Sequence, residues 1–387
     1  MKDLIFINSH PIQYFAPMYK RMNEMGVKTA CWYCTDATVQ GGFDQQFGID
    51  IKWDIPLLQG YEYKFFKNNS WKPSHSNGFF GLINLSMIQE LFKIERSVIV
   101  VHGWHYFTLF WILILGKICA HTICLRCELP NNQEVLKRGW AQKVKCFGLK
   151  YILFPRINYF LYIGKQNRIF YESFGIPDEK LISCPYSVDN LRFRDAYFTL
   201  QGRIPSIKNE LHIPASAKIV VFSAKYIPKK RPLDLLQAFG KLEDTNLWLI
   251  MVGEGELRPQ MELLIRESNI KNVILTGFVN QSKISEYYAI GDLFVMCSGI
   301  GETWGLSVNE AMNFDLPLII SDFSGCSGDL VKQGINGYTF KTGNIDDLTS
   351  KLKFVLLDNK LTKDISSMEI VSDYSYETVA RNLYVLV

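Results

Sequence analysis

Two glutamates separated by seven residues stand on either side of a glycine that is suited to begin a helix. They are Glu302 and Glu310, and the residues between them include Thr303, Trp304, Gly305 and Leu306. A helix that begins after Gly305 would present backbone N–H groups and the positive end of its dipole to an anion such as a diphosphate. Glu302 would lie in the loop before that helix, within reach of a sugar. Glu310 would lie inside the helix, where its carboxylate can bind a ribose diol through charge-assisted hydrogen bonds.

Two lysines stand where a diphosphate would need cations. Lys225 follows the apolar strand pattern of residues 218–224, and Lys230 comes shortly after it, before a helix whose first turn holds Pro232. Cations at this place would offset the charge that develops on a leaving phosphate. The sequence contains no Asp-x-Asp, a pair of carboxylates that would hold a divalent ion on a diphosphate. We therefore expect the lysines to do this work without a metal or any other cofactor.

Two further motifs follow strand patterns in the same half of the chain. Gly253 and Glu254 come after the strand predicted at Leu247–Val252, and Gly277 and Phe278 come after the next one. The first motif lacks the third glycine of a dinucleotide fingerprint, so alone it is weak. The second could hold a base through backbone contacts. Donor binding and a surface acid are equally good interpretations of Glu254.

Polar residues also follow predicted strands in the N-terminal half, where they are candidates for binding an acceptor. The candidates are His102, His10, Gln13, Arg126 and Glu128. Because the carboxyl ends of parallel strands meet at one edge of a sheet, these side chains are expected to face a ligand. The structural alternatives are a hydrogen-bonded core histidine for His102, a turn fixed by proline around His10, and a buried ion pair between Arg126 and Glu128.

Short apolar strands alternate with helical patterns along almost all of the 387 residues. This pattern is typical of βα units and predicts an α/β fold of two tandem Rossmann-like, doubly wound domains that face an interdomain cleft. We expect an N-terminal acceptor-binding domain over residues 1–190 and a nucleotide-sugar-binding domain over 191–370. The helix predicted at 371–387 is expected to pack back toward the N-terminal domain. Residues 41–77 are rich in aromatic and turn residues and predict loops and short strands beside the cleft.

The net charge of +4 is unevenly distributed. Residues 135–171 contain eight Lys and Arg, no acid, and several interleaved aromatic residues. This composition suits peripheral association with an anionic membrane surface or a lipid-diphosphate acceptor, and the alternative is a solvated helix face. No nucleic-acid-binding motif is present, so no nucleic acid partner is expected. The absence of a long apolar run and of an export signal predicts a cytoplasmic protein, peripheral on the inner face of the membrane.

Taken in order, these motifs resemble those of glycosyltransferase family 4, which has the GT-B fold. The matching elements are Lys225 with Lys230, then 253–255, then 277–279, then the E-x7-E pattern that ends at Glu310. The resemblance covers residues 150–340 well and the N-terminal domain loosely. It departs at Lys225, where the family often has an arginine with bidentate geometry. It also departs at residues 8–14, which replace a glycine-rich loop.

The resemblance implies retention of anomeric configuration and assigns roles to single residues. Glu302 would contact the donor sugar, Glu310 the ribose, and the two lysines the diphosphate. His102 would lie near the reacting sugar, through its imidazole or its backbone carbonyl. The sequence thus predicts a metal-independent hexosyltransferase that moves a sugar from a nucleotide-sugar to a glycan or lipid-linked acceptor in cell-surface polysaccharide biosynthesis. The alternatives are a nucleotide-sugar epimerase or hydrolase on the same fold, and a non-catalytic nucleotide-sugar-binding protein.

Overall fold

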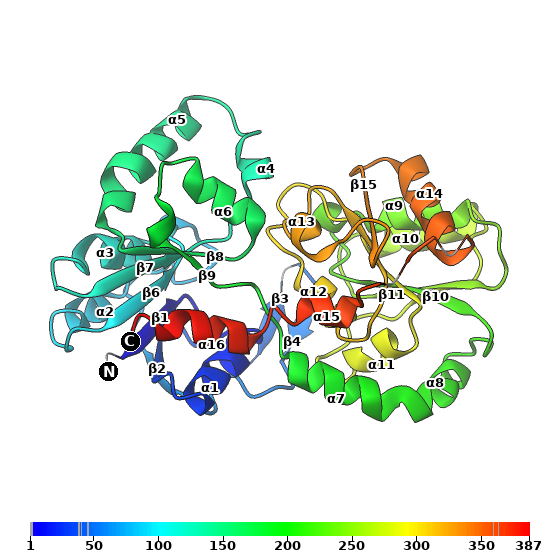
Figure 1. Ribbon diagram of the computed structural model, residues 1–387, viewed down its shortest axis with the longest axis horizontal. Helices are drawn as coiled ribbons and strands as arrows, with labels where there is room; N and C mark the ends of the chain where they lie inside the picture. The colour runs from blue at the N-terminus through cyan, green and yellow to red at the C-terminus, as the bar shows by residue number, and fades with distance from the viewer. Residues whose placement is uncertain (1–2, 38, 40, 45, 359, 363) are drawn as a thin grey trace. The chain divides into compact units, whose positions relative to one another are not determined.

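A computed structural model describes residues 3–37, 39, 41–44, 46–358, 360–362 and 364–387. The chain divides into two compact units, each formed around a parallel sheet (Figure 1). The first unit consists of Met1–Gly42, Pro56–Tyr186 and Ser375–Val387, and the second of Phe43–Ile55 and Ser187–Tyr374. Among the described residues, no helix combines the length and the apolar character needed to span a membrane.

The sheet of the first unit has the strand order β5-β2-β1-β6-β7-β8-β9. Its strands are β1 (Leu4–Asn8), β2 (Thr29–Tyr33), β5 (Glu62–Phe65), β6 (Val98–His102), β7 (Thr122–Arg126), β8 (Tyr159–Tyr162) and β9 (Leu181–Ser183). The central strands are covered on both faces, and their sequences are accordingly continuous apolar runs, as in Val98–Val101. The strand order reverses between β1 and β6, which is the position where ligands bind in open α/β sheets.

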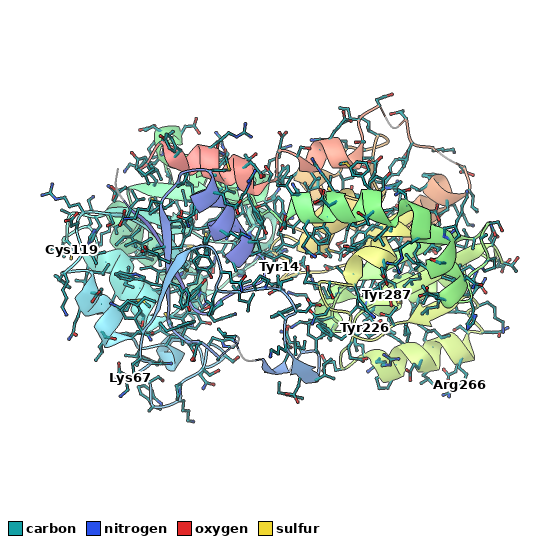
Figure 2. All side chains as sticks on the ribbon, turned by 90° about the horizontal axis from the view of Figure 1, so that it is seen from below. Tyr14, Lys67, Cys119, Tyr226, Arg266 and Tyr287 are labelled. Atoms are coloured by element: carbon teal, nitrogen blue, oxygen red, sulfur yellow. The ribbon has the colours of Figure 1, made fainter. Side chains whose placement is uncertain are left out.

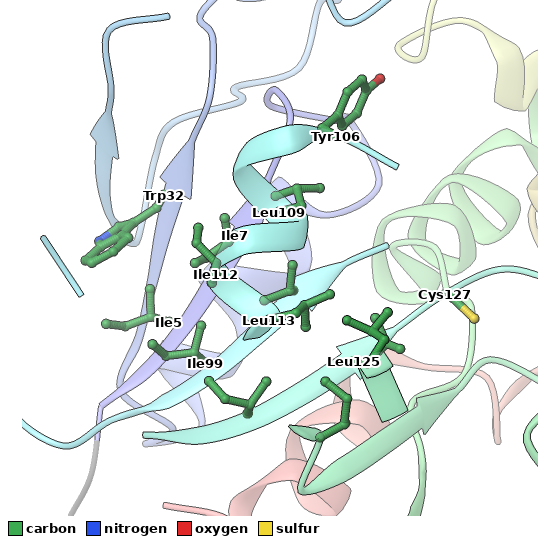
Figure 3. Close-up of a cluster of buried hydrophobic side chains, with 14 of the residues drawn as sticks. Ile5, Ile7, Trp32, Ile99, Tyr106, Leu109, Ile112, Leu113, Leu125 and Cys127 are labelled. Atoms are coloured by element: carbon green, nitrogen blue, oxygen red, sulfur yellow. The ribbon is translucent and has the colours of Figure 1, made fainter. Parts of the chain in front are cut away.

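Helices cover both faces of this sheet. They are α1 (Ala16–Glu24), α2 (Leu85–Glu90), α3 (Phe107–Leu115), α4 (Asn131–Glu134), α5 (Trp140–Phe147), α6 (Lys165–Glu172) and α16 (Tyr376–Tyr384). Figure 3 shows the apolar side of α3, where Leu109, Ile112 and Leu113 point toward the sheet residues Ile7 and Ile99. On the opposite face α16 lies beside α1 (Figure 1).

The C-terminal helix α16 is part of the first unit. Arg21 Nε of α1 donates to a carboxylate oxygen of Glu377 at 2.7 Å. The hydroxyl of Tyr376 donates to the carbonyl of Tyr14 at 2.9 Å. Residues 375–387 therefore return to the N-terminal part of the chain and complete its helical layer.

The sheet of the second unit has the order β12-β11-β10-β13-β14-β15. Its strands are β10 (Lys218–Ser223), β11 (Leu247–Val252), β12 (Val273–Leu275), β13 (Leu293–Met296), β14 (Leu318–Ser321) and β15 (Gly337–Phe340). Here the order reverses between β10 and β13. The loops that follow these two strands carry Lys225 and Glu302, so the topology brings the predicted cation and the predicted carboxylate to one edge.

The helices of the second unit are α7 (Asn190–Leu200), α8 (Ile204–Glu210), α9 (Pro232–Gly240), α10 (Arg258–Glu267), α11 (Ile284–Ala289), α12 (Leu306–Met312), α13 (Ser327–Leu330), α14 (Ile345–Leu356) and α15 (Ser367–Val371). The sequence pattern gave no helix for α7. It forms because Asp189 accepts a hydrogen bond from the backbone N–H of Arg192 at 3.0 Å, which caps the helix. Phe193 then buries its ring against Tyr288 and Phe314.

The segment 43–55 differs from its expected place. The sequence puts it in the domain of residues 1–190, but the structure groups it with the second unit. It contains β3 (Gly42–Asp44) and β4 (Ile49–Ile51), which pair with each other. The physical reason is aromatic packing, because Phe47 and Trp53 both contact the ring of Phe278. The expected boundary at residue 190 likewise lies at 186 in the structure.

Candidate functional site

The loop that follows β13 places Glu302 against Lys230. Glu302 is 6% exposed, and its carboxylate forms an ion pair with Nζ of Lys230, from the 3-10 helix Pro228–Lys230. The two loops are joined by a hydrogen bond of 2.7 Å from the N–H of Gly299 to the carbonyl of Lys229. Burial raises the pKa of the Glu302 carboxyl, but the charges of Lys230 and Lys229 outweigh it, so this pKa lies below its usual value.

Lys229 belongs to the same cluster, although the sequence did not single it out. Burial lowers the pKa of its ammonium, Glu302 opposes this, and the neighbouring Lys230 and Lys225 lower it further. Two ammonium groups, Lys230 and Lys229, thus act on the carboxylate of Glu302, and the charge of Lys225 reaches Lys229. An incoming anion with two or more charges would relieve their mutual repulsion, which is the electrostatic requirement for a diphosphate site.

Helix α12 begins where the sequence predicts, directly after Gly305. This glycine has a φ of +108°, and a Cβ at its position would lie 2.5 Å from Cε of Met296. Both the left-handed backbone and the close approach require glycine. The neighbouring Thr303 and Leu306 are half-buried.

Trp304 does not present its side chain to a ligand. The indole is 2% exposed, donates to Oδ1 of Asn309 at 2.8 Å, and lies 5.6 Å from the ring of Tyr374. Its side chain therefore holds the loop onto α12. Only the backbone of this residue remains for the donor contact that the sequence predicts.

Glu310 is buried inside a network that the sequence analysis missed. One carboxylate oxygen accepts from the hydroxyl of Tyr288 at 2.8 Å and the other from the amide of Gln281 at 3.3 Å. Arg192 in turn donates to the side-chain oxygen of Gln281 at 2.7 Å. The ribose contact of Glu310 stays a prediction, and Tyr288 and Gln281 fix the orientation of its carboxylate.

The loops after β10, β11 and β12 touch one another. The N–H of Gly253 donates to the carbonyl of Gly277 at 3.0 Å, which joins the two glycine motifs. A Cβ on Gly253 would lie 2.0 Å from the carbonyl oxygen of Ala224. Tyr226, which Figure 2 shows within the second unit, donates its backbone N–H to the carbonyl of Glu254 at 2.8 Å. The glycines are therefore needed to place the loop that carries Lys225.

The carboxylate of Glu254 is bound within its own loop. It lies 2.7 Å from Nη1 of Arg258 and also accepts from the N–H of Gly255 at 3.2 Å. Lys225 is held as well, by Asp44 from the segment 43–55 at 2.9 Å. Phe278 lies against the same segment.

In the first unit, His102 ends β6 as predicted. Its ring lies 4.8 Å, centre to centre, from Phe15 in an edge contact. Among the described residues its Nε2 is buried without a hydrogen-bond partner. Burial, followed by the charge of Arg126, lowers the pKa of His102 well below its usual value, so the imidazole is neutral.

Arg126 and Glu128 differ sharply in access. The guanidinium of Arg126 is buried, lies 4.5 Å from the ring of Tyr186, and has Nη1 3.5 Å from the carboxylate of Glu128. The same carboxylate accepts from the Tyr186 hydroxyl. The structural alternative for Arg126, an ion pair of a buried charge, is thus what the structure contains. The side chain of Glu128 is 36% exposed, and its contact with an acceptor stays a prediction.

His10 follows β1 and pairs with a second histidine that the sequence did not single out. The ring centres of His10 and His75 are 4.6 Å apart. Burial, together with His75, lowers the pKa of His10 to about 4. Gln13 is half-buried in the turn before α1. Within the described part of the chain, no three His, Cys, Asp or Glu side chains are grouped to hold a metal ion, and metal independence stays a prediction.

Part of the second unit matches a known protein family. Residues 203–369 match the family described as glycosyl transferases group 1. The match covers 167 of the 387 residues of the chain. All the donor-side candidates, from Lys225 to Glu310, lie within the matched residues.

Curated relatives match the chain over part of their length. The chain is 29% identical over 182 residues to sulfoquinovosyl transferase SQD2 of Arabidopsis thaliana, covering 46% of this chain and 33% of that protein. It is 27% identical over 166 residues to alpha-monoglucosyldiacylglycerol synthase of Acholeplasma laidlawii, covering 42% of this chain and 41% of that protein. The chain therefore spans between a third and a half of the length of these relatives.

Solved structures resemble the chain over its whole length. The structure of HepE from Anabaena in complex with UDP and glucose has a TM-score of 0.71 at 14% identity and covers 100% of this chain and 99% of that one. At this identity the likeness shows the fold, which is GT-B. The predicted fold class is therefore confirmed, with two α/β units that each contain a parallel sheet.

Proposed function

We propose that this chain is a retaining, metal-independent glycosyltransferase that moves a hexose-type sugar from a nucleotide-sugar to a glycan or lipid-linked acceptor. The observation that carries the proposal is the buried pair of Glu302 and Lys230 beside Lys229 at the carboxyl edge of the second sheet. This edge lies within the group 1 glycosyl transferase match. It combines cations for a departing diphosphate with a carboxylate for the sugar.

Each group has a distinct task in the proposed transfer. The lysines stabilise the negative charge that develops on the diphosphate as the bond to the sugar breaks, and they are in place beforehand, so no reorganisation is needed. Glu302, held ionised by the same lysines, binds a hydroxyl of the donor sugar. His102 is neutral and contributes a hydrogen-bonding group or its backbone carbonyl near the reacting sugar.

The names of the relatives support an acceptor class for this chain. Alpha-monoglucosyldiacylglycerol synthase is named for a glycolipid product, and the HepE structure contains UDP with glucose. These names support a nucleotide-sugar donor and a role in glycolipid or surface-polysaccharide synthesis for this chain. A cytoplasmic protein that is peripheral on the inner membrane face would meet both substrates.

The donor proposal is tested by turnover of a panel of UDP-, GDP- and ADP-sugars in the presence of EDTA. Glu302→Gln removes the charge that the lysines surround, and we expect it to lower nucleoside diphosphate release by about 100-fold or more. The matched control is Glu256→Gln, an exposed glutamate in the same unit, which should leave release unchanged. Equal activity of the two variants would contradict the assignment of Glu302 to the donor site. Epimerised sugar in the absence of any acceptor would favour the epimerase alternative.

We further propose that helix α5 associates with an anionic membrane surface. None of its side chains is buried, and Trp140 is 78% and Phe147 60% exposed. A cavity of about 540 Å³ borders the helix, and its lining includes Phe147, Lys150, Tyr151 and Phe174 together with Glu134. Aromatic rings beside lysines suit the boundary between acyl chains and anionic headgroups.

Sedimentation with vesicles tests this surface. The protein should bind phosphatidylglycerol vesicles and not phosphatidylcholine vesicles, and added salt should weaken the binding. Phe147→Ser should reduce the bound fraction several-fold. Phe198→Ser, which removes an equally exposed phenylalanine from the second unit, is the control. A similar reduction for both variants would rule out a specific role for α5.

A further inference from the structure

Segment 43–55 brings a carboxylate onto the lysine assigned to the diphosphate. Nζ of Lys225 lies 2.9 and 3.0 Å from the two carboxylate oxygens of Asp44 and 3.1 Å from Oε1 of Gln46. It also lies 4.5 Å from the centre of the Phe47 ring. Two close anionic oxygens are what a phosphate group would offer to the same ammonium. Asp44 therefore occupies, by its chemistry, the position of a phosphate.

The carboxylate of Asp44 is charged at neutral pH. Burial raises the pKa of Asp44, but Lys225 and the backbone N–H groups of Phe47 and Gln46 outweigh this, so the pKa is lower than usual. The two N–H groups donate to the same oxygen at 3.0 and 2.8 Å. Asp44 thus competes for Lys225 as a full negative charge.

The segment has anchors that do not involve Lys225. The ring of Phe278 lies 5.2 Å from Phe47 and 6.0 Å from Trp53, centre to centre. The side-chain amide of Asn280 donates to the carbonyl of Lys52 at 2.7 Å, and the N–H of Ser282 donates to the carboxylate of Asp54 at 3.1 Å. These contacts can keep the segment in place while the Asp44 side chain turns away. An exchange at Lys225 is therefore a local event.

We propose that Asp44 holds the diphosphate position on Lys225 in the ligand-free protein and is displaced by the diphosphate of the donor. Asp44 then sets the affinity for the donor. The exchange replaces one anion by another on the same ammonium, and no covalent bond or proton changes. The proposal rests on the proposed function, because it takes Lys225 as a ligand of the diphosphate.

The expected size of the effect follows from the exposure of the pair. The side chains of Lys225 and Asp44 are 24% and 33% exposed, so water weakens their attraction. The pair then changes an equilibrium by a factor of about two to five. Because only the fraction with a free lysine binds the ligand, removing the competitor should tighten binding by that factor.

The experiment is calorimetric titration of the full chain with UDP, GDP and ADP, and with inorganic pyrophosphate as a probe that lacks a base. Asp44→Asn should tighten diphosphate binding about two- to fivefold. Asp50→Asn makes the same change of charge on the same hairpin, at an exposed position of β4, and should leave affinity unchanged. Thermal unfolding of each variant checks that the fold is intact.

A double-mutant cycle separates this proposal from the assignment of Lys225. Lys225→Met should weaken binding. In the Lys225→Met background Asp44→Asn should have no further effect, because the ammonium for which Asp44 and the diphosphate compete is absent. If Lys225→Met leaves affinity unchanged, the diphosphate assignment fails. If Lys225→Met weakens binding while Asp44→Asn weakens it too or changes nothing, the assignment stands and the displacement proposal is overturned.

Discussion

The two sheets of this protein end in polar residues at their carboxyl edges, but the charge state of the titratable groups differs between the edges. In the second unit Glu302 stays ionised because Lys230 and Lys229 stabilise its negative charge. In the first unit burial lowers the pKa of His102 and His10, so both imidazoles are neutral. The second edge thus has an ionised carboxylate among cations, and the first has neutral imidazoles beside the ion pair of Arg126 and Glu128.

This difference fits two parts of the proposed reaction, the departure of the diphosphate and the binding of the acceptor hydroxyl. A departing diphosphate gains charge during transfer, so fixed cations are useful where it leaves. An acceptor hydroxyl and a sugar carry no charge, and a fixed charge beside them would need compensation. Arg126, whose charge acts on His102, is accordingly buried against the rings of Tyr186 and Phe15. We infer that the fixed cations of the second unit serve the leaving group.

Removal of one cation from each edge should give the largest difference in stability between the two edges. Lys230→Met leaves the buried carboxylate of Glu302 without its direct partner, and we expect a loss of about 3 kcal/mol in the free energy of unfolding. Arg126→Met should cost less than about 1 kcal/mol, because the partner Glu128 is 36% exposed and can be hydrated. Urea unfolding of both variants gives the two values.

A double variant tests whether the unpaired charge of Glu302 causes the loss of stability in Lys230→Met. If the loss in Lys230→Met comes from the stranded charge, adding Glu302→Gln should recover most of it. Equal losses for the lysine and arginine variants, or no recovery in the double variant, would show that the two edges do not differ in the way described.

The sequence predicted the sheets and the donor edge well for a physical reason. Strands covered on both faces must be apolar throughout, so runs such as Leu247–Val252 stand out and coincide with β11. In a parallel sheet the next residues in the chain lie at the carboxyl edge, so Lys225 and Glu302 could be located from their order alone. Helix α12 could be located because Gly305 marks its start.

The features that the sequence did not predict depend on contacts between distant residues. The place of segment 43–55 is decided by Phe278 and Asn280, and the latter bonds to Lys52 across 228 positions of the chain. The burial of Arg126 depends on Phe15 and Tyr186, which lie on either side of it in sequence. No pattern among neighbouring residues of the sequence indicates these contacts between distant residues. The pairing of His10 with His75 belongs to the same class.

The smallest expected effect is the pH dependence of stability, which tests whether the imidazole of His10 at the first edge is neutral in the folded chain. His10 has a pKa of about 4 in the folded chain and an ordinary value of 6.5. Between these values the unfolded chain binds the proton and the folded chain does not, so acid favours unfolding. Stability should fall by at most about 1.4 kcal/mol per pH unit as the pH drops below 6.5. Glu302, whose pKa is lowered from 4.5, contributes stability that is fully present well above that value and is lost only as the pH falls through the carboxyl range, so it adds nothing near pH 6.

Thermal unfolding of the wild type and of His10→Gln between pH 7.5 and 5 measures this contribution. The wild type should lose more stability on acidification than the variant, because the glutamine has no proton to bind in the unfolded chain. His102 remains in both proteins and should keep part of the slope, since its pKa is also lowered. Parallel profiles of the two proteins would mean that His10 titrates alike in the folded and unfolded chains. The first edge would then lose its neutral histidine, and the contrast with Glu302 would rest on His102 alone.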